Sequence, residues 1–182
     1  MAMMKIQSQI DSIFDSLSVD SFGSLADSTI RDSFDDLLTR LNADAGALWI
    51  VEHDKPDELT IAVNVGARGS TIEGNVSQGL DTGLVSRAYR EKELVHDQGA
   101  FRHPEQSMDV DMQLGQFTAY QIACPFQMFD KTIGAVTVIQ LSSAENATTR
   151  EWGFQEEDVT SFTRWISVAQ QLFEYARLRS ED

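Results

Sequence analysis

The chain has 182 residues, 42% of them hydrophobic and 24% charged, a length and balance typical of one globular domain with a single core. Its 14 basic and 29 acidic side chains give a formal net charge of −15, which repels phosphate backbones and anionic lipids and so argues against nucleic-acid and membrane partners. No apolar run approaches the roughly 20 residues of a membrane span, no signal peptide is recognisable, and one cysteine, Cys124, fits a reducing compartment, so we expect a cytoplasmic protein.

Two helices are predicted at the N-terminus. Apolar residues alternate steps of four and three over about residues 3–17, close to a heptad seam: Ile6, Ile10, Ile13 and Leu17. The polar run 18–23 is expected to break this helix. We therefore divide the chain into residues 1–23, an N-terminal dimerisation helix with a linker, and residues 24–182, the main domain. A second helix is predicted over about residues 25–41.

A hairpin is predicted next. Residues 45–52 are apolar with little alternation, which is typical of a strand covered on both faces. Residues 54–57 contain Pro56 and predict a turn, and residues 59–65 alternate as a second strand does. Residues 66–79 are rich in glycine and polar side chains and predict a loop.

The middle of the chain predicts short elements followed by a second hairpin. We expect a short helix over residues 83–90, a strand over 93–97, and another short helix within 104–115 with Pro104 in its first turn. Runs 118–129 and 132–141 predict paired strands. In the first of these, alternate residues share one face: Tyr120, Ile122, Cys124, Phe126 and Met128.

The strongest predicted helix covers residues 154–179 and carries two adjacent apolar stripes. One stripe comprises Val159, Phe162, Ile166, Ala169, Phe173 and Ala176, and the other Trp165, Val168, Leu172 and Tyr175. The domain's own sheet can cover one stripe, and the other requires a partner helix. We favour a homodimer through the terminal helices over the alternative that one broad stripe packs within the monomer.

Local sequence marks in this order resemble those of GAF domains, the sensory and dimerising modules of signalling proteins. The marks are Gly83-Leu84-Val85, Val95-His96-Asp97, Ala123-Cys124-Pro125-Phe126, the run 133–138, and Phe154 with Asp158. The resemblance covers about residues 32–176. It implies an α+β, PAS-related fold with a central antiparallel sheet of about six strands. Terminal helices would lie on one face, and short helices and loops on the other.

The resemblance also implies a small-molecule pocket on the loop face. Its implied ligand-binding lining is Trp49, Thr82, Gly83, Leu84, Asp97, Gln113, Tyr120, Cys124 and Thr137. No cofactor is predicted. No metal site is predicted either, because the spacings of His96, Asp97, His103, Asp109 and Asp111 match no ligand motif. Cys124 could be a pocket wall or a redox sensor, but its apolar strand favours a buried, inert thiol.

We expect a non-enzymatic module that binds a small molecule or a protein partner. The alternative is a dimerisation adaptor with a vestigial pocket, and a GAF-derived redox enzyme ranks below both. Cyclic-nucleotide-binding relatives carry Lys and Glu where this chain has Ala147 and Val159. Free methionine sulfoxide reductases need several cysteines, and Leu84 stands where they place one. Bilin-binding relatives usually carry a cysteine in the middle loop, which here has none.

Overall fold

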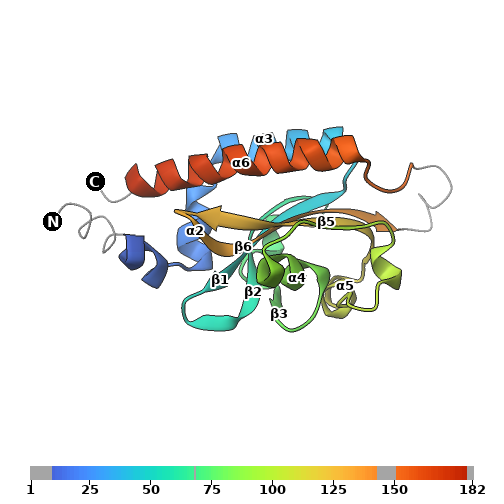
Figure 1. Cartoon of the computed structure of the whole chain (residues 1–182), viewed down its shortest axis with the longest axis horizontal. Coiled ribbons are helices and arrows are strands. Elements are labelled where there is room, and N and C mark those ends of the chain that lie inside the picture. Colours follow the sequence, from blue (N-terminus) through green and yellow to red (C-terminus); the bar gives the residue numbers. More distant parts are fainter. Residues whose placement is uncertain (1–9, 68, 143–150, 180–182) are drawn as a thin grey trace.

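A six-stranded antiparallel sheet forms the centre of the molecule, with strands in the order β3-β2-β1-β6-β5-β4. The computed structural model describes residues 10–67, 69–142 and 151–179, without the side chains of Phe101, Asp109 and Gln113. Helices α3 and α6 lie side by side over one face of the sheet, and α4 and α5 lie on the other (Figure 1). This arrangement confirms the predicted fold class.

The observed elements follow the predicted order closely. The strands are β1 (Ala45–Glu52), β2 (Lys55–Gly66), β3 (Ser77–Gly79), β4 (Val95–Asp97), β5 (Phe117–Met128) and β6 (Lys131–Ser142). The helices are residues 10–15, α2 (Val19–Leu25), α3 (Ser28–Arg40), α4 (Leu84–Glu91), α5 (Asp109–Leu114) and α6 (Glu156–Arg179), with 3-10 turns η1 (Ser70–Ile72) and η2 (Ala100–Arg102). No helix in these described ranges has both the length and the apolarity that a membrane crossing needs.

The first helix does end before residue 18, as predicted, but the linker predicted over residues 18–23 is wrong, because most of these residues belong to helix α2. Ser18 caps this helix in a capping box with Ser21, so its polar residues satisfy the first backbone N–H groups. Phe22 is fully buried and stacks on Phe173 of α6 with ring centroids 4.5 Å apart. The segment therefore belongs to the core. The first predicted helix is described only from residue 10, and Ile6 lies outside the described residues.

Two predicted roles for prolines are also wrong. The turn between β1 and β2 is tighter than expected, because Glu52 pairs directly with Lys55. Pro56 consequently lies inside β2, at an exposed position, rather than in the turn. Pro104 does not open the next helix, since α5 begins five residues later at Asp109.

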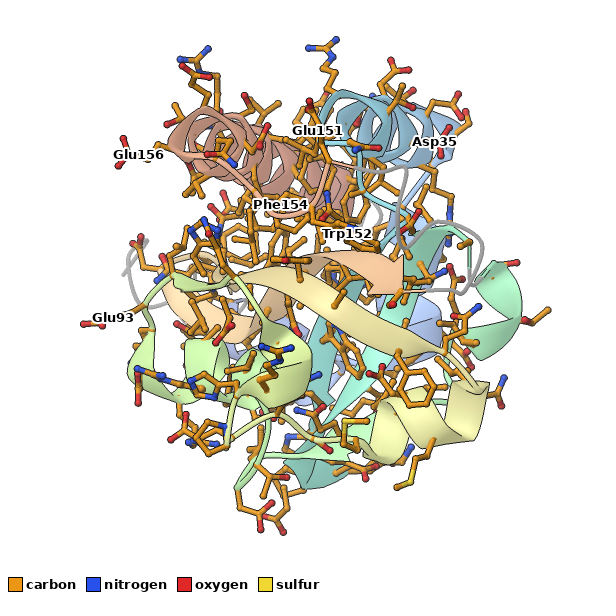
Figure 2. All side chains as sticks on the ribbon, turned by 90° about the vertical axis from the view of Figure 1, so that its right-hand side faces the viewer. Asp35, Glu93, Glu151, Trp152, Phe154 and Glu156 are labelled. Carbon is orange, nitrogen blue, oxygen red and sulfur yellow. The ribbon has the colours of Figure 1, made fainter. Side chains whose placement is uncertain are left out.

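The largest core lies between the sheet and the layer of α2, α3 and α6. Its fully buried aromatic side chains come from every layer: Phe22, Phe34, Phe126, Phe154, Phe162 and Phe173. Figure 2 places Phe154 and Trp152 in the space between the helices and the sheet. Four members of the first predicted α6 stripe are buried here, at positions 162, 166, 169 and 173. This part of the helix prediction is confirmed.

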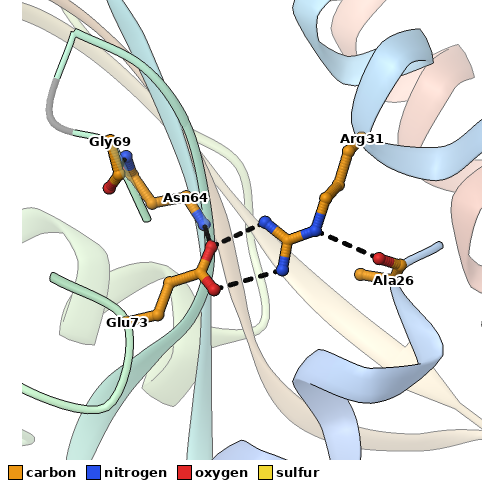
Figure 3. A network of polar contacts seen from close by, with 5 residues as sticks. All are labelled: Ala26, Arg31, Asn64, Gly69 and Glu73. Carbon is orange, nitrogen blue, oxygen red and sulfur yellow. Dashed lines mark hydrogen bonds and ion pairs between the residues drawn. The ribbon is translucent and has the colours of Figure 1, made fainter. Parts of the chain in front are cut away.

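A network of charged and polar groups joins the helix layer to the loop after β2 (Figure 3). Arg31 of α3 forms a two-point ion pair with Glu73, with N···O distances of 2.7 and 3.1 Å. The same guanidinium donates from Nε to the Ala26 carbonyl. Glu73 also accepts the backbone N–H of Asn64, whose side chain donates to the Gly69 carbonyl. The pair therefore fixes α3 against the edge of the sheet.

We predict that Gly134→Ala destabilises the fold by about 3 kcal/mol or more. A Cβ at Gly134 would overlap the backbone carbonyl of Trp49 on the neighbouring strand, and a backbone atom has little room to move. Thermal or urea unfolding of the variant measures the change. Thr132→Ala in the same strand is the control and should change stability by less than about 1 kcal/mol. Equal stability of the two variants would contradict this account of the β1–β6 contact.

We predict a coupling energy of about 1 kcal/mol between Arg31 and Glu73, because the pair is bidentate and only partly exposed. A double-mutant cycle with Arg31→Met, Glu73→Gln and the double variant measures it by urea unfolding. The coupling should fall in high salt. Additive single effects would show that the two side chains act independently.

Candidate functional site

A small cavity lies on the face of the sheet opposite α3 and α6. It is bounded by strands β1, β2, β5 and β6, by α4 and by α5. Its polar lining is Asn64, Gln78, Gln106, Ser107, Asp111, Thr118, Gln121 and Thr137, and its apolar lining includes Trp49, Leu84, Val85, Val110 and Ile139. The volume open to the centres of water-sized molecules is about 30 Å³, room for about two waters.

The floor of the cavity is fixed by a contact between the two central strands. Ala47 of β1 pairs with Thr137 of β6, which brings the side chain of Trp49 beside the threonine. The Trp49 indole N–H donates to Thr137 Oγ1 at 3.2 Å, and this hydroxyl lies 3.5 Å from the Ala47 carbonyl oxygen. Both side chains are buried. The indole is therefore held against the sheet and presents its ring to the cavity.

The rim next to α4 is organised by Gln78. Its Nε2 donates to the Thr82 carbonyl at 3.0 Å and to Ser86 Oγ at 2.9 Å. Gly83 begins α4 with φ +91, and a Cβ there would overlap the Gln78 side chain. Glycine is therefore needed at this position for both backbone conformation and space. The two hydrogen bonds of Gln78 thus fix the turn before α4 against strand β3.

The opposite wall is closed by Asp111 of α5, which is 2% exposed. One carboxylate oxygen accepts the backbone N–H of Thr118 and the other accepts its hydroxyl, each at 2.8 Å. A β-bulge between Thr118 and Tyr120 interrupts the regular alternation of side chains along β5. In a regular strand these two residues would share a face, whereas here Thr118 faces the cavity and Tyr120 packs against the helix-side core. The bulge thus creates this wall.

A second, more open hollow lies beside the cavity. It has a volume of about 350 Å³ and is lined by Asp81, Thr82, Gly83, Arg90 and residues 104–108. Arg90 donates to the Leu80 carbonyl, which holds its guanidinium at this rim. Gln106 and Ser107 border both hollows. This short segment therefore lies between the buried cavity and the second hollow, which we call the outer cleft.

The structure divides the predicted pocket residues among three places. Trp49, Leu84 and Thr137 line the cavity, and Thr82 and Gly83 line the outer cleft. Asp97 lies on the short edge strand β4, with its carboxylate 3.5 Å from His103 Nε2. The Gln113 side chain lies outside the described part of the structure.

Tyr120 and Cys124, predicted to contribute to the pocket, lie on the wrong face for that role. Tyr120 stacks on Trp152 with centroids 5.7 Å apart, and both predicted residues pack against the core beneath the helices. Their shared face with Ile122 and Phe126 was predicted correctly, and that face is the one covered by helices. Burial raises the pKa of the Cys124 thiol from 9.0 to about 11.

Seven polar cavity residues were not predicted: Asn64, Gln78, Gln106, Ser107, Asp111, Thr118 and Gln121. A polar side chain within an apolar strand is the sequence signal that could have identified Gln121. The residue is 4% exposed, and its side-chain amide makes no hydrogen bond to another described residue. Within the described ranges, no three His, Cys, Asp or Glu side chains come close enough to hold a metal ion.

The comparisons with known proteins agree on the fold. The structure resembles the GAF domain of a phosphoenolpyruvate-protein phosphotransferase from Coxiella burnetii, with TM-score 0.64 and 21% identity over 98% of this chain and 95% of that one. The chain has a GAF-like fold. No protein-family model matches the sequence, and a search of curated proteins also finds no match.

Enzymes share this GAF-like fold. A type II free methionine-R-sulfoxide reductase from Thermoplasma acidophilum has TM-score 0.62 and 16% identity, over 85% of this chain and 96% of that one. A free methionine-R-sulfoxide reductase from Neisseria meningitidis has TM-score 0.63 and 15% identity, over 88% of this chain and 89% of that one. The prediction that the chain is not an enzyme is contradicted by these neighbours, since their fold carries catalysis.

We predict that Cys124 of the folded protein reacts with iodoacetamide about a hundredfold more slowly at pH 8 than in the urea-unfolded chain. The reason is that its pKa is raised from 9.0 to about 11, and the thiolate is the nucleophile. The native rate should rise with pH up to about 11. Because the unfolded thiol loses its proton first, this group lowers stability as pH rises from 9.0 to about 11. Equal rates in the two states would refute the buried setting.

Proposed function

We propose that this chain is a sensory or regulatory GAF-like module that binds a small molecule in the cavity and dimerises through α3 and α6. One observation carries the proposal. Strands β1, β5 and β6 direct alternate side chains into a polar cavity on one face and against the terminal helices on the other. In β1, Trp49 lines the cavity while Leu48 and Ile50 pack in the helix-side core. The GAF-domain neighbours support the same assignment.

The dimer surface that we propose is the second apolar stripe of α6. Val168 is 53% exposed, Leu172 39% and Tyr175 60%, and together they make a row of large apolar groups along one helix. Trp165, the first member of the stripe, instead stacks on Phe34 with centroids 4.3 Å apart. Such a row in water is typical of an interaction surface.

A second copy of the chain is the partner that fits this surface best. A hollow of about 370 Å³ lies between α3 and α6, next to the stripe, and is lined by Leu37, Trp165, Val168, Ala169 and Leu172, among others. Because the second apolar stripe and the hollow lie on the same face, two-fold symmetry lets the stripe of each copy fill the hollow of the other. Asp36 and Arg164 both border it, so opposite charges are available to meet across the axis.

The network of Figure 3 supplies a route between the two faces. Asn64 lines the cavity, its backbone N–H is held by Glu73, and Glu73 is held by Arg31 of the dimer helix α3. A ligand that moved Asn64 would therefore act on the position of α3. Coupling further requires that the ligand bind one helix arrangement better than the other.

The size of the cavity favours a second candidate function. Room for about two waters is far less than most ligand pockets offer, as expected for a dimerisation adaptor whose pocket is vestigial and which binds another protein but no metabolite. A ligand-induced rise in Tm separates the two functions, because only the sensor predicts it. For either function we propose a cytoplasmic setting, since one cysteine in the chain suits a reducing compartment.

We predict that Val168→Asp converts a homodimer to a monomer in sedimentation or light-scattering measurements. A charge in the middle of the proposed interface would have to lose its water on association. Met112→Asp is the matched control, because Met112 is 67% exposed on α5, across the sheet from the stripe. A wild-type chain that stays monomeric at high concentration, or a Val168→Asp dimer, would contradict the proposal.

A further inference from the structure

We propose that the cavity recognises a small uncharged group that carries a hydrogen-bond donor and acceptor side by side, such as a primary carboxamide, and that the Gln121 amide pairs with it. The inference rests on the proposed function, in which this cavity binds a ligand. It adds the chemical class of that ligand and the side chain that selects it.

Gln121 is the observation that carries the inference. It lies on β5 opposite Ile139 of β6, lines the cavity and is 4% exposed. Its side-chain amide makes no hydrogen bond to another described residue and is left to face the open space of the cavity. A ligand that enters the cavity can therefore form hydrogen bonds with both ends of this amide without displacing a protein partner. The group that pairs with both its N–H and its C=O is another amide.

Gln140 on the adjacent strand shows what a structural glutamine looks like in this protein. It is 0% exposed, like Gln121 it lies in the sheet, and both ends of its amide are bonded. Its Nε2 donates to the Asn42 carbonyl at 3.1 Å, and its Oε1 accepts the N–H of Gly153 at 2.8 Å. The two glutamines differ in their hydrogen bonds: both ends of the Gln140 amide are bonded to backbone groups of the protein, whereas the Gln121 amide makes no such bond within the described residues.

The charges around the cavity exclude an anionic ligand. Among the described residues that line it, Asp111 is the one with an ionisable side chain, and no lysine or arginine contributes. The first turn of α4 also borders the cavity through Leu84 and Val85. A helix N-terminus supplies about half a positive charge, less than the full negative charge of a carboxylate. The balance disfavours a second negative charge.

The experiment compares acetamide, acetate and acetamidinium, which share one shape and differ in charge. Each is titrated into the isotope-labelled protein while the indole N–H resonances are followed by NMR. Trp49 reports on the cavity, and Trp165, whose indole N–H donates to the Ser33 hydroxyl of α3, is the internal control. We expect acetamide to shift the Trp49 signal saturably in the millimolar range and acetate to leave it unchanged.

Gln121→Leu keeps the side-chain size and removes the amide. It should weaken acetamide binding at least about tenfold without lowering Tm, because the amide makes no hydrogen bond to another described residue that the substitution could break. Gln140→Leu is the matched variant, and it should lower Tm by about 4–8 °C because it leaves two bonded groups without partners.

Three outcomes overturn the inference. Saturable binding of acetate or acetamidinium in preference to acetamide would refute the ligand class, while recognition by the cavity would stand. Unchanged acetamide binding to Gln121→Leu would refute the role of Gln121 alone. If none of the three compounds shifts the Trp49 signal saturably, both the proposed ligand class and ligand binding by the cavity are refuted. The proposed dimer is unaffected by that result, because the Val168→Asp variant tests it separately.

Discussion

The whole arrangement depends on two central strands, β1 and β6, that cannot face water on either side. Nearly every residue of both strands is buried, so the sheet needs a covering layer on each face. The two layers are unlike. Long helices with large aromatic side chains fill one completely, whereas the other is made of the short helices α4 and α5 and their loops. Short elements leave unfilled space over the strands, and the polar cavity lies there.

Elements with a strong periodic signal were predictable from the sequence. The apolar runs of β1 and β6 and the 3–4 spacing along α6 reflect burial that repeats at fixed intervals. Helix α2 was missed because it buries only Val19 and Phe22, and its serines look like loop residues. Those serines are cap residues. A short helix held by its caps and by one buried aromatic side chain, Phe22, has too few apolar positions to show a period.

The site was harder to predict, for two physical reasons. Alternation along β5 shows which residues share a face, but it does not show which layer covers that face, and this is why Tyr120 and Cys124 were assigned to the pocket. The bulge after Thr118 also changes which side chains point to the cavity. Whether Gln121 and Gln140 are bonded depends on partners far away in the sequence, such as Asn42 for Gln140. No local pattern distinguishes these two glutamines.

The central claim is that the fold leaves a recognition site beside Gln121, across the sheet from the helix layer. A high-resolution crystal structure tests it most directly, because electron density reveals whatever occupies the cavity. We expect density for ordered water or a small molecule within hydrogen-bond distance of the Gln121 amide. A cavity closed by protein side chains, with that amide bonded to one of them, would contradict the account.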